Sequence, residues 1–95
     1  MEKQFFVYIA TNKRHTVLYT GITNNVHRRM FEHKEQTIDS FTKQYNVNKL
    51  VWFQIFQNPN EAIAAEKKIK GWIRIKKIAL INEMNPTWRD FLSSC

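Results

Sequence analysis

The chain has 95 residues, 43% of them hydrophobic and 14% aromatic, so we expect one folded domain over residues 1–95 with no second core. Fifteen Lys and Arg against eight Asp and Glu give a net charge of +7, which favours nucleic acid as a partner over a surface made basic only for solubility. The single cysteine, Cys95, excludes an internal disulfide and a zinc cluster built from cysteine.

The first predicted element is a β-hairpin. Two short runs rich in β-branched and aromatic residues, 5–10 and 18–21, flank a polar segment, which is typical of two strands joined by a turn. Each strand carries one tyrosine, Tyr8 in the first and Tyr19 in the second. We expect Gly21 to turn the chain where a residue with a side chain would be strained.

Residues 26–34 are predicted to form a helix with a narrow apolar edge. His33 lies on this edge, where a metal ligand, a base, a phosphate contact and a packed histidine all remain open interpretations. Arg29 is four residues earlier and therefore on the same face. Thr23 or Asn24 could cap the start of the helix.

The next segment, residues 35–49, has no clear period. It contains Phe41, Thr42, Lys43 and Tyr45, a mixture of aromatic, hydroxyl and cationic groups that can stack on bases and contact phosphates. For Phe41 we favour packing of the loop onto the core, and for Tyr45 both roles remain open.

Residues 50–56 form the clearest strand of the sequence. Their nearly continuous apolar composition predicts a central or near-central position in a sheet. Asn60 is expected to cap a following helix over residues 61–70, which is rich in alanine, glutamate and lysine.

Glu66 is the residue of this helix that is hardest to explain as an ordinary solvent-exposed side chain. The apolar stripe of the helix consists of Ala62, Ile63 and Ile69, and Glu66 falls within it. A carboxylate on an apolar face is costly without a partner, so the position favours a function for Glu66. Gly71 is expected to end or bend the helix.

Residues 72–83 alternate like a strand at first and then repeat like a helix. We predict a helix, with Ile75 and Ile78 among its repeating apolar positions, because the helical pattern is the longer one. The pair Asn85-Pro86 ends it, and a short turn follows.

Four polar side chains, those of Tyr8, Tyr19, Arg29 and Glu66, suggest a catalytic site if they converge. A carboxylate can hold Mg²⁺, an arginine can bind a phosphate through two hydrogen bonds, and a tyrosine can orient or deprotonate a water. Together these are the parts of a phosphodiester hydrolase that uses one metal ion. The alternatives are ordinary ones: a packed tyrosine with its hydroxyl at the surface and a solvated arginine.

In this order the residues resemble the GIY-YIG nuclease superfamily. Val7-Tyr8-Ile9 and Tyr19-Thr20-Gly21 are similar to its paired motif, and Arg29 stands ten residues after Tyr19, like the helix arginine of the family. Segments similar to its small stand-alone bacterial members are residues 41–47, 66–72 and 84–90. The first motif lacks its usual glycine and isoleucine, and Thr20 replaces an isoleucine, changes that affect packing more than chemistry.

The resemblance implies an α/β (α+β) domain in which helices flank a three-stranded antiparallel sheet. It also implies cleavage of DNA that depends on one Mg²⁺ or Mn²⁺ ion, bound by Glu66, with no small-molecule cofactor. The DNA could be structured, as in repair or recombination, or single-stranded. We expect nucleic-acid contacts from four residues: Lys34, Thr42, Lys43 and Tyr45.

Five further residues take catalytic roles through this resemblance. Tyr8 and Tyr19 would orient or activate the attacking water. Arg29 would stabilise the charge that develops on the phosphate, and His33 would assist at the phosphate or in proton transfer. Asn85 would support the site from the last segment.

Two other functions remain open at this point: a nucleic-acid-binding module of the same fold with little turnover, and a protein-interaction domain. Metal-dependent cleavage would distinguish a nuclease from the binding module. The protein-interaction domain, unlike both of these, is expected to bind no DNA even at low salt. No segment resembles a signal peptide or reaches the ~20 apolar residues of a membrane span, so we expect a soluble, cytoplasmic protein that contacts no membrane. The oligomeric state is open.

Overall fold

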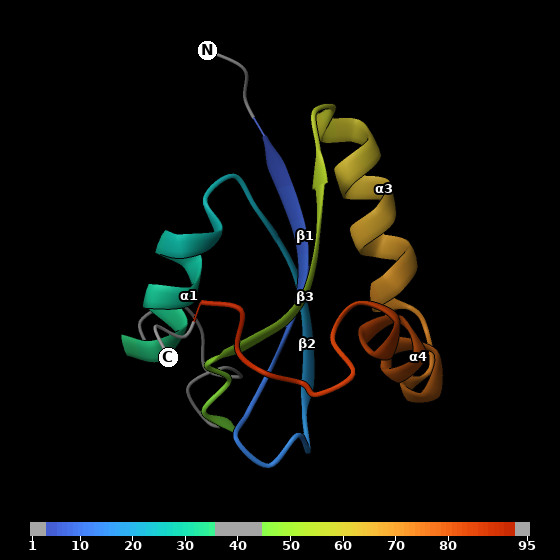
Figure 1. Ribbon diagram of the computed structural model, residues 1–95. Helices are drawn as coiled ribbons and strands as arrows, with labels where there is room; N and C mark the ends of the chain where they lie inside the picture. Colours follow the sequence, from blue (N-terminus) through green and yellow to red (C-terminus); the bar gives the residue numbers. More distant parts are fainter. Residues whose placement is uncertain (1–3, 36–44, 93–95) are drawn as a thin grey trace.

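The fold is an antiparallel sheet of three strands with helices on both faces (Figure 1). The computed structural model describes residues 4–35 and 45–92. Its elements are β1 (Phe5–Thr11), β2 (Leu18–Thr23), α1 (Val26–Glu35), β3 (Lys49–Phe56), α3 (Pro59–Lys70) and α4 (Arg74–Met84). The strand order is β2-β1-β3, and both pairings are antiparallel. The predicted α+β fold with a three-stranded antiparallel sheet is therefore confirmed.

Each face of the sheet has its own apolar core. Helix α1 covers one face, and α3 and α4 cover the other (Figure 1). Side chains alternate between the two faces along a strand, so Val7 and Ile9 of β1 pack toward α3, whereas Tyr8 and Ala10 pack toward α1. The hydroxyl-bearing Tyr8 is thus directed to the face that α1 covers.

Strand β3 lies at the edge of the sheet, so the predicted central or near-central position was wrong. The pairing of β1 with β3 shifts between Ile9 and Ala10, whose partners are Trp52 and Leu50. Val51 is the extra residue of this bulge, so Val51 and Trp52 both pack on the α3 face. The strand is apolar because its first half is buried on both faces.

The C-terminal segment covers this half of β3 in place of a fourth strand. The amide of Phe91 donates to the carbonyl of Leu50 at 2.9 Å, and the amide of Leu50 donates to the Asp90 carboxylate at 3.1 Å. The side-chain amide of Asn85 donates to the carbonyl of Val51 at 3.2 Å. These bonds satisfy backbone groups that an edge strand otherwise leaves to solvent.

Helix α3 begins two residues earlier than the sequence predicts, and its cap is Asn58 rather than Asn60. The Asn58 side-chain oxygen accepts hydrogen bonds from the amides of Asn60 at 2.8 Å and Glu61 at 3.3 Å. Pro59 is the first helical residue, a position where its missing N–H costs nothing. The residue before a proline is biased to an extended backbone, which is also the geometry of a cap.

Helix α1 is capped by Asn25, not by Thr23 or Asn24. The Asn25 side-chain oxygen accepts from the amide of Arg28 at 3.0 Å. The Thr23 hydroxyl instead accepts from the amide of Asn25 at 3.1 Å, which fixes the turn that leads from β2 into the helix.

Two isoleucines that the sequence assigns to the core are exposed, Ile63 by 42% and Ile75 by 69%. With 3.6 residues per turn, Ile63 lies about 120° around α3 from the buried Ile69. Ile75 lies about 120° around α4 from Ile81, which is fully buried. The stripe of α3 that faces the sheet therefore holds Ala62, Glu66 and Ile69 without Ile63.

Residues from distant parts of the chain hold the turn between β1 and β2. The Arg74 guanidinium donates to the carbonyls of His15 at 2.6 Å and Thr16 at 3.2 Å. The His15 and Trp88 rings are 4.9 Å apart, and both residues have a positive φ. Burial, and then the charge of Lys49, lower the pKa of His15. The hairpin that carries both tyrosines is thereby fixed to the start of α4.

Across residues 4–35 and 45–92, no helix has the length and apolar character that would be needed to cross a bilayer.

Candidate functional site

Three of the predicted catalytic side chains meet on the face of the sheet that α1 covers: Tyr8 of β1, Tyr19 of β2 and His33 of α1. The Tyr8 hydroxyl and His33 Nε2 share a buried hydrogen bond of 3.0 Å. The ring centroids of Tyr8 and Tyr19 are 6.2 Å apart, and those of Tyr19 and His33 are 5.3 Å apart. Three separate elements thus bring these rings into one cluster.

Burial gives the two tyrosines different environments. Tyr8 and His33 are fully buried, whereas Tyr19 is half-buried. Tyr19 also lines a hollow at the outer edge of β2. Tyr19 is therefore the more accessible of the two tyrosines, and Tyr8 is the hydrogen-bond partner of His33.

Gly21 makes room for the Tyr8 ring and does not turn the chain. It lies within β2 directly opposite Tyr8, and its φ is not positive. A Cβ atom built on Gly21 would lie 2.5 Å from both Cζ and the hydroxyl oxygen of Tyr8. The turn that the sequence predicts at this glycine is therefore wrong, because the requirement for glycine comes from a neighbour on another strand.

Gly21→Ala should destabilise the protein by about 1–3 kcal/mol, since the Tyr8 ring is enclosed and cannot move away without disturbing its neighbours. Thermal denaturation would register this as a decrease in Tm of about 4–8 °C per kcal/mol. Gly71→Ala is the matched control, because its Cβ would be 3.6 Å from the nearest atoms, an ordinary contact. Equal stability of the two variants would contradict the proposed clash.

Arg29 lies one turn before His33 on α1. Its Nε is 3.4 Å from a carboxylate oxygen of Glu32, and both side chains are partly exposed. The same Nε is buried and makes no hydrogen bond within the described part of the chain. Such an ion pair holds the guanidinium weakly, so Arg29 can turn toward a phosphate at little cost.

Glu66 approaches from the other side of the sheet. Helix α3 packs on β1 and β2, on the face opposite α1. The Glu66 side chain is 14% exposed, and Lys70 Nζ lies 4.0 Å from one carboxylate oxygen. The structure therefore brings Tyr8, Tyr19 and His33 together on one face of the sheet, with Arg29 one turn before His33 on α1. It places Glu66 on the opposite face of the sheet.

A hollow of about 300 Å³ lies at the β2 edge between these two groups. Leu18, Tyr19 and Thr20 line it from β2, Lys70 from α3 and Lys77 from α4. Tyr19 belongs to the aromatic cluster, and Lys70 is the ion-pair partner of Glu66. The hollow thus contacts a residue of each part of the predicted site, Tyr19 and the ion-pair partner of Glu66, at the β2 edge, which is a free edge among the strands that the structure describes.

The residues present fit a hydrated divalent cation. Among the described residues, no group of three or more His, Cys, Asp or Glu side chains is arranged to hold a metal. Mg²⁺ commonly binds through one or two carboxylates and completes its octahedron with waters and substrate phosphate. The largely buried carboxylate of Glu66, which forms a 4.0 Å ion pair with Lys70, suits this kind of binding.

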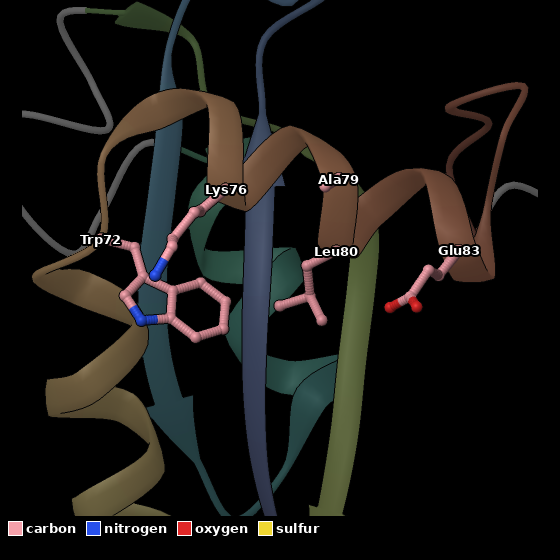
Figure 2. Close-up of a pocket in the computed structure, with 5 residues that line it drawn as sticks. All are labelled: Trp72, Lys76, Ala79, Leu80 and Glu83. Carbon is pink, nitrogen blue, oxygen red and sulfur yellow. The ribbon is translucent and has the colours of Figure 1, made fainter.

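A second hollow, of about 340 Å³, lies beneath α4 and is separate from the predicted catalytic residues. Figure 2 shows its lining: Trp72, Lys76, Ala79, Leu80 and Glu83. The Lys76 ammonium is 5.6 Å from the centre of the Trp72 ring. Because the Glu83 carboxylate is part of its lining, this hollow suits a phosphate backbone less well than the hollow at β2, which two lysines and no carboxylate line.

The predicted nucleic-acid contacts are only partly within the described residues. Lys34 is exposed and forms an ion pair of 3.4 Å with Asp90, and Tyr45 is exposed as well. Thr42 and Lys43 lie outside the described residues. The contacts themselves remain predictions.

Asn85 is buried and engaged in the fold. Its amide nitrogen donates to the carbonyls of Val51 and Arg89 at 3.2 and 2.8 Å. Its amide oxygen accepts from the Arg89 amide at 3.2 Å and from the Thr87 hydroxyl at 3.4 Å. These bonds hold the C-terminal segment on β3, and a catalytic contribution of Asn85 remains a prediction.

Sequence reasoning missed the two lysines that line the hollow at β2. Lys70 follows Glu66 by four residues, and this helical spacing was a signal that could have found it. Lys77 lies on a different helix, so no local pattern connects it to the site. Burial, and then the charge of Lys70, lower the pKa of Lys77.

The chain is similar to proteins of known sequence and structure. Residues 4–79 match the family model described as the GIY-YIG catalytic domain. A UPF0213 protein of Clostridium perfringens is 38% identical over 77 residues, which cover 81% of this chain and 82% of that protein. A UPF0213 protein of Staphylococcus saprophyticus is 32% identical, with 87% and 99% covered. The solution NMR structure of a UPF0213 protein from Bacillus halodurans is similar with a TM-score of 0.59 and 28% identity, over 92% of each chain.

Proposed function

This chain belongs to the GIY-YIG catalytic-domain family, and on that premise we propose that it is a divalent-metal-dependent endonuclease that hydrolyses DNA phosphodiester bonds in the cytoplasm. The observation that carries the proposal is the cluster of Tyr8, Tyr19 and His33. Strands β1 and β2 each supply one tyrosine, and α1 supplies the histidine. The net charge of +7 supports a polyanionic substrate.

In this proposal Tyr19 orients the attacking water and, in its ionised form, accepts the proton that the water loses, because it is the more accessible tyrosine. The hydrogen bond between Tyr8 and His33 fixes the histidine ring beside Tyr19. His33 is then positioned to take up or return a proton through the tyrosine hydroxyl. The pair Tyr8–His33 thereby positions the residue that meets the water.

Arg29 binds the nonbridging phosphate oxygens and stabilises the negative charge that develops on them. The Glu66 carboxylate would hold the Mg²⁺ or Mn²⁺ ion. When bound, such an ion acidifies water and neutralises charge on the phosphate and the leaving oxygen. The hollow at the β2 edge gives a strand of nucleic acid access to Tyr19 and to the Glu66 side of the site.

The proposal is tested by incubating the purified protein with labelled single-stranded, duplex and branched DNA, with MgCl₂ or MnCl₂. We expect cleavage that EDTA abolishes and added metal restores. Arg29→Ala, purified in the same way, should cleave about 100–1,000-fold more slowly, because one charge-stabilising group of the transition state is lost.

Two outcomes would contradict the proposal. Equal cleavage by Arg29→Ala and the wild type would indicate a contaminating nuclease. Salt-dependent DNA binding without metal-dependent cleavage of any substrate would identify a binding module of the same fold.

A further inference from the structure

We propose that the hollow at the β2 edge is an anchor for a nonreacting phosphate of the nucleic-acid strand, held by Lys70, Lys77 and Thr20. The inference rests on the proposed function, because it places this phosphate next to the one that is cleaved. The ligand chemistry is that of a phosphate group, which free inorganic phosphate shares with a phosphodiester.

The charge of the hollow suits an anion. Two of its five lining side chains are lysines from different helices, and no carboxylate is among the five. Lys70 forms a 4.0 Å ion pair with Glu66, and its side chain is largely exposed. Both lysines line the hollow, and burial, followed by the charge of Lys70, lowers the pKa of Lys77. An anion between the two lysines would offset the repulsion between their charges.

Thr20, which also lines the hollow, carries a buried hydroxyl. It is 4% exposed, and its hydroxyl oxygen has no hydrogen-bond partner within residues 4–35 and 45–92. Leu18 and Ile22, two positions away on either side of it in β2, share its face of the strand and pack against the apolar core. A buried hydroxyl without a partner is costly, and a phosphate oxygen would provide one.

The hollow also lies in the right place for a strand of nucleic acid. Tyr19 lines it, and its ring packs against His33 in the cluster of the proposed site. Lys70 is one helical turn from Glu66 on α3. A phosphate bound in the hollow therefore sits beside the tyrosine that we assign to the water and one turn of helix from the proposed metal ligand.

The test measures binding of a fluorescent oligonucleotide by anisotropy in EDTA, where cleavage does not occur, at several salt concentrations. Lys77→Gln should weaken binding about tenfold at low salt, and the slope of log K against log[salt] should decrease in magnitude by about 0.7–0.9, the contribution of one phosphate contact. Lys68→Gln is the matched control, since Lys68 is an exposed α3 lysine outside the hollow, and it should weaken binding no more than about twofold. Lys77→Arg keeps the charge and should retain most of the affinity.

Thr20→Val gives a second, independent measurement. It removes the unpartnered hydroxyl without changing the volume, so the free protein should keep or raise its Tm while the oligonucleotide binds several-fold more weakly. A hydroxyl with only a structural role would not produce this combination. Unchanged affinity in Thr20→Val, or equal affinity of Lys77→Gln and Lys68→Gln, would overturn the inference.

Inorganic phosphate as a competitor separates the two sources of the ligand. Competition with the oligonucleotide in the wild type and in Lys68→Gln, but not in Lys77→Gln, supports a shared phosphate site. Phosphate binding that depends on Lys77 while oligonucleotide binding does not would identify a site for the free ion and overturn the anchor. If the wild type never cleaves DNA but Lys77→Gln still loses binding, the nuclease proposal fails and the anchor stands.

Discussion

Replacing Glu66 with glutamine should lower metal-dependent cleavage about 1,000-fold and leave the fold intact. Glutamine keeps the size and polarity of the side chain but removes the negative charge that attracts a divalent cation. A bound ion contributes several kcal/mol to the stabilisation of the transition state, and about 4 kcal/mol corresponds to a factor of about 1,000 in rate. The ion pair with Lys70 is long and partly exposed, so its loss should hardly change the Tm.

The measurement combines single-turnover cleavage with a titration of Mn²⁺ binding by electron paramagnetic resonance. Glu66→Gln should lose the bound Mn²⁺ signal at concentrations that saturate the wild type. Glu83→Gln is the control, because Glu83 is a carboxylate on α4 in the other hollow, and it should bind and cleave normally. Cleavage within about tenfold of the wild type in Glu66→Gln would rule out Glu66 as the metal ligand.

Removing the two tyrosine hydroxyls one at a time should give opposite results. Tyr19→Phe should decrease kcat about 100–10,000-fold, the range expected for loss of general acid–base catalysis, with little effect on stability because Tyr19 is half-buried. Tyr8→Phe should instead destabilise the fold by about 1–3 kcal/mol, because the buried His33 Nε2 loses the hydroxyl to which it is hydrogen-bonded. Its effect on the cleavage rate should be the smaller of the two.

Single-turnover rates and thermal denaturation of both variants provide the measurement. The Tm of Tyr8→Phe should be lower by about 4–8 °C for each kcal/mol lost, and that of Tyr19→Phe should be unchanged. If Tyr8→Phe were stable and had the larger decrease in rate, Tyr8 rather than Tyr19 would be the residue that orients and deprotonates the attacking water.

The sequence predicts the local elements well, because local patterns determine them. The β-branched and aromatic composition of residues 5–10 identifies β1, and the helical spacing in 26–34 identifies α1. The capping residues were each misplaced by one or two positions, since several asparagines lie close together before both helices. At Asn58 the following proline decides which asparagine is the cap.

The errors concern relations between distant residues. The apolar run of β3 gave no information about its place in the sheet, because the C-terminal segment buries it as a neighbouring strand would. The requirement for glycine at position 21 depends on the strand register, which places Tyr8 opposite Gly21. Neither the pairing register nor the approach of Lys77 to the β2 edge is encoded in a local pattern.

The same is true of the arrangement of the candidate site. Spacing alone places Arg29 and His33 on one face of a helix, and the structure agrees that they lie one turn apart on α1. Spacing cannot tell which face of the sheet α3 will cover. Glu66 consequently approaches across the β2 edge rather than from the side of the tyrosines, a geometry that only the assembled sheet determines.

The central position of β1 has a consequence for synthesis of the chain. β1 leaves the ribosome first, and β2 can pair with it soon afterwards, but the pairing of Phe5 with Phe56 requires the third strand. Until then the nascent hairpin exposes an unpaired strand edge beside Val7 and Ile9, a surface prone to association with other chains. The tyrosine-bearing hairpin is therefore made early but enclosed late, and molecular chaperones that protect strand edges should matter most during the synthesis of residues 24–56.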